Sequence, residues 1–335
     1  MSLTSPKISV LITAFNEECY LSLALDSLLA QTFDDFEIIL INDGSTDQTQ
    51  TIIEHYCQKD SRVVACHLHK NGGRVAGLNK AAELATGKYY AIMDSDDYSC
   101  TTRLDKQYAF LEKNPSLGMT ASFFNQIDSR GVIIKTVDKL PENQEILKEI
   151  LYQDNPICHG TVMVRASVFH QLGGYRPAFC STEDYDFYLR LLDISAIGIV
   201  PEVLYHYRVH GNSLSSKRLL QLQMKHLAQV LSVERRSPMV ENGTGLPRCG
   251  QDSLQAQPCL ADQHDYVQQF LRSDVHARRG YYSQSLVEMG KKYYRLKQFQ
   301  AASVLLKQSL TLNPFNFKAF RYQLACQLKR RRFFV

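Results

Sequence analysis

Short apolar runs alternate with segments of helical periodicity through the first hundred residues of the chain. These runs are residues 8–13, 36–41, 63–68 and 89–93. The run at 63–68 is the weakest of the four, and each of the others is rich in aliphatic or aromatic side chains. Leu21, Leu25 and Leu28 recur at the spacing of one helical face, and residues 75–84 show a similar pattern. Strict alternation of this kind predicts a parallel sheet with helices on both faces and right-handed crossovers.

The alternation becomes less regular after Pro115. Two apolar runs separated by a turn at Ser129, Arg130 and Gly131 predict a strand pair, 119–124 and 132–137. Further along, we expect helices over 144–152, 182–192 and 216–233 and strands over 160–165, 197–200 and 204–209, with a short helix ending at 172. The long amphipathic helix 216–233 is expected to close a first domain, residues 1–233.

The composition changes after this first domain. Residues 234–262 are rich in Pro, Gly, Gln and Ser, have little periodicity and are predicted to be a linker. Residues 263–335 are predicted to be helical. Seven residues there match the spacing of one tetratricopeptide unit: Leu286, Gly290, Tyr293, Phe299, Ala302, Leu306 and Pro314. Ordinary helix packing is the alternative explanation. A single repeat needs flanking helices, expected over 265–277 and 317–328.

The apolar run that starts at Tyr89 leads directly into Asp94, Asp96 and Asp97, three carboxylates within four residues. Such close anions repel one another and favour a bound cation. Oxygen ligands suit Mg²⁺ or Mn²⁺ better than Zn²⁺. In open α/β sheets, ligands bind just beyond the carboxyl ends of strands, which is where these residues fall. The alternative is a solvated acidic turn capping the helix near Arg103.

The composition excludes several classes of protein. With 335 residues, 44% hydrophobic content and a net charge of +4, the chain has material for a large core but no charge excess typical of nucleic-acid binding. Nine scattered cysteines without a CxxC pair argue against a disulfide scaffold and a cysteine zinc site. No secretory signal or 18-residue apolar run is present, so a cytoplasmic protein is expected. The basic and aromatic end, residues 329–334, could touch the inner face of a membrane, or be a solvated helix end.

Polar residues cluster where strands are predicted to end. Thr13 to Glu17 follow the first strand, Asp43 the second, and a polar segment from Arg208 to Ser213 the last. Ser45 and Gln48 have the spacing of a capping box for the helix after the second strand. Neither a GxGxxG after the first strand nor a GxxxxGK[ST] motif is present, which disfavours dinucleotide and P-loop sites.

Five segments in order resemble the inverting glycosyltransferases of family 2, which have the A-type glycosyltransferase (GT-A) fold. They are ISVLITAFNEECYL, EIILINDGSTDQT, NGGRVAGLNKAAELATGKYYAIMDSDD, GGYRPAFCSTEDYDFYLRL and YRVHGNS. The resemblance covers about residues 8 to 215. Two positions depart from it: Thr13, where the family usually has proline, and Leu78, where many members have arginine. The second departure makes Arg74 the nearest candidate for a basic partner of the diphosphate.

The resemblance implies roles for most of these polar residues. Phe15 would give an apolar wall for the base, and the nucleotide-binding residues would be Thr13, Phe15, Glu17, Asp43, Arg74 and Asp94. Asp96 and His210 would hold the metal, Mn²⁺ or Mg²⁺, which would bridge the two phosphates. Asp43 could instead make an Asx turn, and His210 could be a plain surface residue.

The resemblance also identifies Asp184 as the base and Glu183 as a supporting residue. Inversion at an anomeric carbon needs one carboxylate to take the acceptor's proton. Alternatively, both acids complement the helix dipole, an effect that would lower the pKa of Asp184. Glu183 is expected to point elsewhere on the helix. His159, Gly173 and Gly174 are candidates for shaping the acceptor side.

The expected activity is transfer of a sugar from a nucleotide-diphospho-sugar, a UDP-sugar first, to a hydroxyl of a glycan or lipid-linked acceptor. This would be a hexosyl- or hexosaminyltransferase of cell-surface polysaccharide or glycoconjugate synthesis. The C-terminal helices could bind a protein partner, and no nucleic acid partner is expected. The alternatives are a sugar-phosphate nucleotidyltransferase and a catalytically weak, nucleotide-sugar-binding scaffold.

Overall fold

The computed structural model describes residues 5–210, together with Lys225, Ala228, Gln229, Ser232, Leu306 and Tyr322. Within the predicted helix 216–233, the four described residues are all helical. The rest of that helix, the predicted linker 234–262 and nearly all of the helical segment 263–335 lie outside the described residues. The chain divides into two compact units, Met1–Pro258 and Cys259–Val335. In the described part, no helix has the length and apolar character needed to cross a membrane.

Strands and helices alternate in the first half, as the apolar pattern predicts. The elements there are β1 (Ile8–Ala14), α1 (Leu21–Leu29), β2 (Phe36–Asn42), α2 (Thr49–Lys59), β3 (Val63–His67), α3 (Arg74–Leu84), β4 (Tyr89–Asp94), β5 (Tyr98–Ser99) and α4 (Arg103–Lys113). The second half continues with β6 (Leu117–Ile127), β7 (Ile133–Val137), α5 (Gln144–Gln153), the 3₁₀ turn η1 (His159–Thr161), β8 (Met163–Arg165), α6 (Ala166–Gln171), the 3₁₀ turn η2 (Pro177–Phe179), α7 (Glu183–Leu191) and β9 (Ala196–Arg208).

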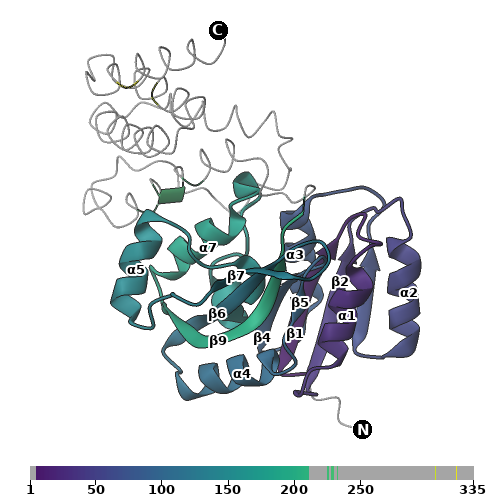
Figure 1. Ribbon diagram of the computed structural model, residues 1–335, viewed down its shortest axis with the longest axis horizontal. Helices are drawn as coiled ribbons and strands as arrows, with labels where there is room; N and C mark the ends of the chain where they lie inside the picture. Colours follow the sequence, from purple (N-terminus) through teal and green to yellow (C-terminus); the bar gives the residue numbers. More distant parts are fainter. Residues whose placement is uncertain are drawn as a thin grey trace. The chain divides into compact units, whose positions relative to one another are not determined.

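All strands of the described residues belong to one curled sheet (Figure 1). Their order is β3-β2-β1-β4-β8-β6-β9-β5, and β7 pairs with β6 at the side. β3, β2, β1 and β4 run parallel to one another. β8 is antiparallel to both β4 and β6, so β6 runs in the direction of β4, and β9 is parallel to β6. The carboxyl ends of β1, β2, β4, β6 and β9 therefore share one edge of the sheet.

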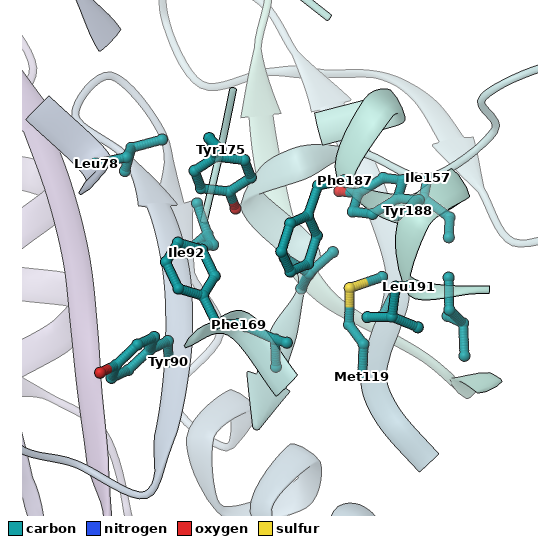
Figure 2. Packing of buried hydrophobic residues seen from close by; sticks show 14 of the residues in the cluster. Leu78, Tyr90, Ile92, Met119, Ile157, Phe169, Tyr175, Phe187, Tyr188 and Leu191 are labelled. Carbon is teal, nitrogen blue, oxygen red and sulfur yellow. The ribbon is translucent and has the colours of Figure 1, made fainter. Parts of the chain in front are cut away.

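The sheet separates two hydrophobic layers because its central strands are buried on both faces. In β4, Tyr90 and Ile92 face one layer, and Tyr89, Ala91 and Met93 face the other. Helices α3, α5, α6 and α7 cover the first face, and α1, α2 and α4 cover the second. Figure 2 shows the first layer, where rings from α6 and α7 pack with Tyr175 against Ile92 of β4. The predicted GT-A-like fold, an α/β sheet with helices on both faces, is confirmed.

Three local predictions differ from the structure. The two short strands expected at 197–200 and 204–209 are one continuous strand, β9, whose register against β6 shifts around Ser122 and Phe123. The two-residue strand β5 was not predicted, because it is too short to show a period. The capping box at Ser45 is wrong, since α2 begins at Thr49 without a side-chain cap. Ser45 Oγ instead accepts a hydrogen bond from the backbone N–H of Asn16 at 3.0 Å.

Gly77 allows α3 to lie close against the end of β1. A Cβ atom at this position would come 2.3 Å from Oγ1 and 2.9 Å from Cβ of Thr13. Thr13 is β-branched and stiff at χ1, so it cannot easily move aside. We expect Gly77→Ala to lower the free energy of unfolding by about 1–2 kcal/mol, because overpacking outweighs the gain in helix propensity. Chemical denaturation measures this loss.

A second substitution separates this contact from a general effect on the helix. Thr13→Ala removes Oγ1, the atom nearest to the added methyl group, and should restore part of the stability lost in Gly77→Ala. The idea fails if the two substitutions are additive, because residues in contact should show a coupling energy.

Candidate active site

A cavity of about 960 Å³ lies at the edge of the sheet where the parallel strands end. The ten residues that the sequence analysis assigned to nucleotide binding, metal binding or catalysis all line it. These are Thr13, Phe15, Glu17, Asp43, Arg74, Asp94, Asp96, Glu183, Asp184 and His210. They span almost two hundred positions of the chain, and the structure brings them to a single place.

The strand register explains this convergence. Thr13 pairs with Ile41 on one side and with Asp94 on the other, so the loops after β1, β2 and β4 begin side by side. β8 runs the other way, and its start lies beside the end of β4, which brings His159 to the same edge. β9 ends beside β6, and this places His210 there too. Each functional segment is thus a strand end or the turn that follows it.

The loops after β1 and β2 hold each other in place. Asn16 has a positive φ of 55°, a conformation that asparagine tolerates better than most residues. Its Oδ1 accepts a hydrogen bond from the backbone N–H of Thr46 at 2.8 Å. The backbone N–H of Glu17 donates to Thr49 Oγ1 at 2.8 Å. This bracing leaves the ring of Phe15 45% exposed on the cavity wall, an unusual position for a large apolar side chain.

Asp43 is buried and holds the turn that leads into α3. Its two carboxylate oxygens each accept a backbone N–H, from Gly72 and from Gly73, both at 2.7 Å. Burial raises the pKa of Asp43, and these two hydrogen bonds partly oppose that effect. The Asx-turn explanation of Asp43 is wrong, because Asn42 is the residue whose Oδ1 accepts the N–H of Ser45, at 3.1 Å.

The acidic turn after β4 is fixed from the end of β9. Asp97 is fully buried, and its Oδ1 accepts the backbone N–H of Arg208 at 2.6 Å. The guanidinium of Arg208 donates to the backbone oxygen of Asp96 at 2.8 Å. Two residues further on, His210 Nε2 lies 2.9 Å from Asp96 Oδ2. The predicted pair Asp96 and His210 is therefore assembled within the cavity.

The carboxylates of this turn give the cavity a negative field. The pKa of Glu17 is raised to about 7, mainly by burial and then by the charges of Asp96, Asp47 and Asp94. Among the described residues, no group of three or more His, Cys, Asp or Glu side chains forms a complete metal site. Mg²⁺ and Mn²⁺ are commonly held by one or two protein ligands, with water and substrate phosphates completing the shell. Asp96 and His210 fit such a cation.

Arg74, the first residue of α3, lies between the donor side and α7. Its Nη2 contacts Asp94 Oδ1 and lies 2.7 Å from His159 Nδ1. Its Nε is 3.3 Å from Glu183 Oε1. His159 Nε2 in turn lies 2.7 Å from the hydroxyl of Tyr175. Burial, and then the Arg74 charge, keep the pKa of His159 well below its usual value, so the imidazole is neutral.

Asp184 faces the cavity from the first turn of α7. Its Oδ2 accepts a hydrogen bond from Asn155 Nδ2 at 2.9 Å. The helix N-terminus does lower the pKa of Asp184, as expected, but it does not decide the net direction. Burial raises that pKa, and the N–H of Tyr185, Arg74 and Asn155 only partly oppose it. A raised pKa makes Asp184 a stronger base than an exposed aspartate.

Glu183 was expected to point elsewhere, yet it also lines the cavity. The pKa of Glu183 is raised to about 7, chiefly by burial; Arg74 lowers it, and the charge of Asp184 raises it further. Its ion pair with Arg74 makes it a supporting residue rather than a second free carboxylate.

A buried ion-pair cluster fixes the helix that carries Asp184. Asp186 binds Arg190 at 2.9 Å and also contacts Arg176. Arg190 donates to the backbone oxygens of Leu172 and Gly174 at 2.7 and 2.8 Å. Gly174 is thus part of the support of α7, and neither Gly173 nor Gly174 lines the cavity, in contrast to the sequence prediction.

Several lining residues were not predicted. These are Asn71, Gly73, Ser95, Phe124, Gln126, Asn155, Pro156, Ile157, Cys158, Ser181 and Tyr207. Asn155 is the most informative of them, because it donates a hydrogen bond to one oxygen of Asp184. The pair Asn155-Pro156 is a turn signal, but a turn signal alone does not show what the asparagine contacts.

Comparison with known proteins gives one matching family. Residues 9–173 match the family described as glycosyl transferase family 2. The O-antigen biosynthesis glycosyltransferase WbnJ of Escherichia coli is 34% identical over 217 residues, which cover 63% of this chain and 83% of that protein.

Two solved structures share the fold. One is S. aureus TarS 1-349 in complex with UDP-GlcNAc, at a TM-score of 0.61 and 20% identity, covering 97% of this chain and 92% of that one. The other is the mannosyltransferase PcManGT from Pyrobaculum calidifontis in complex with GDP-Man and Mn²⁺, at a TM-score of 0.54 and 14% identity, covering 98% and 87%.

Proposed function

Since this chain belongs to glycosyl transferase family 2 and is a glycosyltransferase, we propose that it is an inverting, metal-dependent enzyme that uses a nucleotide-diphospho-sugar. One observation carries the proposal. A single cavity holds the acidic turn with His210 and, from a different element, a separate part-buried carboxylate, Asp184. The groups proposed to bind the donor are thus distinct from the carboxylate proposed to remove the proton, as a direct displacement requires.

The reaction needs few steps from the protein's own residues. Asp184 takes the proton of an acceptor hydroxyl while that oxygen bonds to the anomeric carbon from the face opposite the leaving group. The bond from that carbon to the phosphate oxygen breaks, and its electron pair leaves with the nucleoside diphosphate. Asn155 keeps the Asp184 carboxylate oriented through the bond to Oδ2. A divalent cation held by Asp96 and His210 would neutralise the charge that grows on the diphosphate.

Phe15 and Asp43 are proposed to contact the base of the nucleotide. Glu17 and Asp94 are proposed to line the part of the pocket that holds the ribose. A UDP-sugar is the first donor to test, because the TarS structure holds UDP-GlcNAc, and a GDP-sugar is the second, because the PcManGT structure holds GDP-Man. The proposed acceptor is a hydroxyl of a glycan or lipid-linked glycan in polysaccharide synthesis, in view of the O-antigen role in the name of WbnJ.

Family membership argues against one of the two alternatives, and the geometry of the cavity argues against the other. The resemblance to named glycosyltransferases argues against a sugar-phosphate nucleotidyltransferase. A catalytically weak, nucleotide-sugar-binding scaffold would have no use for a part-buried Asp184 held by Asn155 in the same cavity.

The test is to incubate the full chain with UDP-GlcNAc or GDP-mannose, with Mn²⁺ and with chelator, and to measure release of the nucleoside diphosphate. Metal-dependent release from one donor supports the proposal. The anomeric configuration of the sugar product, read by NMR before it equilibrates, tests inversion. Retained configuration, or no release from either donor while both nucleotides fail to bind, contradicts it.

Phe15→Ala should weaken nucleoside diphosphate binding about tenfold, or ~1.4 kcal/mol, the scale of one lost aromatic contact. The ring is exposed on the cavity wall, so its removal leaves no hole in the core. Calorimetry with UDP and Mn²⁺ measures the change. Leu23→Ala is the matched control, because Leu23 is 54% exposed on α1 and does not line the cavity. Equal effects of the two substitutions would remove Phe15 from the nucleotide site.

A further inference from the structure

Arg74 makes a set of contacts that nucleotide binding alone does not explain. Its guanidinium reaches Asp94 on β4, His159 on η1 and Glu183 on α7. Asp94 and Glu183 belong to opposite sides of the proposed reaction, since one faces the donor and the other directly precedes the base. A planar guanidinium with several fixed donors can hold such partners at a set separation, which a lysine cannot do.

The contact to Glu183 is incomplete in this structure. Arg74 Nε and Glu183 Oε1 are 3.3 Å apart, but Arg74 Nε has no hydrogen-bond partner among the described residues. Glu183 Oε2 likewise has none there, and both atoms are buried. Buried polar atoms without partners are rare in proteins, and each calls for an explanation such as strain or a catalytic role. A small rotation of the guanidinium would close the bond between Arg74 and Glu183.

Asp94 is the contact that competes with this rotation. Its side chain is 15% exposed and lines the cavity, whereas that of Glu183 is 5% exposed. A ligand hydroxyl entering the cavity can therefore reach Asp94 directly. Once Asp94 accepts from that hydroxyl, its hold on Arg74 weakens, and the guanidinium is freer to turn toward Glu183.

We propose that Arg74 is a positioning residue that passes donor binding at Asp94 on to the base helix α7 through Glu183. The inference rests on the proposed function, in which Asp94 meets the donor. Glu183 begins α7 and Asp184 follows it, so a closed bond from Arg74 to Glu183 fixes the first turn and with it the base. The base then becomes ordered when the donor is bound.

The neighbouring contacts make Arg74 suited to this role. His159 Nδ1 accepts from the same Nη2 that contacts Asp94, and His159 is itself held by the Tyr175 hydroxyl. Tyr175 is buried in the core layer beside Phe187 of α7 (Figure 2). His159 and Tyr175 thus hold the guanidinium at one point. When it rotates about that point, only its contacts to Asp94 and Glu183 need to change.

Hydrogen exchange of the full chain with UDP or GDP and Mn²⁺ tests this proposal without an acceptor. In the parent protein, the nucleotide should slow exchange in the turn at 94–97 and also in the first turn of α7. In Arg74→Met and Glu183→Gln, the slowing at 94–97 should remain and that at α7 should disappear. Arg62→Met is the matched control, because Arg62 is also part-buried and paired, with Asp60, outside the cavity.

Each other outcome decides against the proposal in a recognisable way. Unchanged slowing at α7 in Arg74→Met, or none in the parent, shows that Arg74 does not link the two sides. A loss of nucleotide affinity beyond about tenfold in Arg74→Met with α7 unchanged would make Arg74 a diphosphate ligand instead. No slowing at 94–97 with either nucleotide contradicts the proposed function itself. If Arg74→Met does not fold, Arg74→Lys and Glu183→Gln give the same comparison.

Discussion

Asp96→Ala is expected to abolish sugar transfer and to weaken nucleoside diphosphate binding. Asp96 is the carboxylate that lies in the cavity within 2.9 Å of His210, and the two side chains are the proposed cation ligands. Without Asp96, the proposed cation loses a ligand, and the charge of the diphosphate meets the field of Asp94 and Glu17 without it. The loss of several kcal/mol of stabilisation corresponds to about a thousandfold in rate. A transfer or hydrolysis assay, with calorimetry on the same preparation, measures both effects.

Chelator should reproduce this loss in the parent protein, and added Mn²⁺ should reverse it. Asp34→Ala is the matched control, because Asp34 is an exposed aspartate before β2 that does not line the cavity. Full activity of the parent protein in excess chelator would refute the metal requirement. Full activity of Asp96→Ala with metal present would move the cation to other carboxylates of the cavity, Asp94 and Glu17 first.

The sheet, and the edge of the sheet where the cavity lies, were predictable because both follow from local patterns of apolar and polar residues. Buried parallel strands have continuous apolar sequences, and Tyr89 to Met93 is such a sequence, followed directly by the polar residue Asp94. Ligands of open α/β sheets bind where strands end, so the polar residues after each run were candidates as a group. The family resemblance then gave individual roles to residues such as Asp184 and His210 that lie far from the acidic turn in the sequence.

The contacts between these residues could not be predicted from the sequence. Arg74 and Glu183 are more than a hundred positions apart, and only the packing of α7 against the sheet brings them to 3.3 Å. The pKa of Asp184 depends on how deeply α7 is buried, and the sequence suggested only the helix dipole, which acts in the opposite direction. Asn155 lies in a turn, and its role depends on its hydrogen bond to Asp184, a contact that the sequence does not show.

Asp184→Asn is expected to lower sugar transfer by about a hundredfold or more, the usual scale for loss of a general base. The substitution keeps the size of the side chain and an oxygen that can accept the bond from Asn155. It removes the basic lone pair that would take the acceptor's proton. Because the pKa of Asp184 is raised, transfer by the parent should begin to fall at a higher pH than for an exposed aspartate as the solution is acidified.

Donor binding by Asp184→Asn should stay within about threefold of the parent, since the residue lies in the first turn of α7 and its side chain is hydrogen-bonded to Asn155 rather than to the acidic turn. Calorimetry with UDP and Mn²⁺ beside a transfer assay separates the two properties. Loss of donor binding as complete as in Asp96→Ala would place Asp184 in the metal site or in the support of the fold. Transfer at the parent rate would mean that another residue is the base. Glu183 would then be tested first, because its carboxylate lines the same cavity and its pKa, near 7, suits a base at neutral pH.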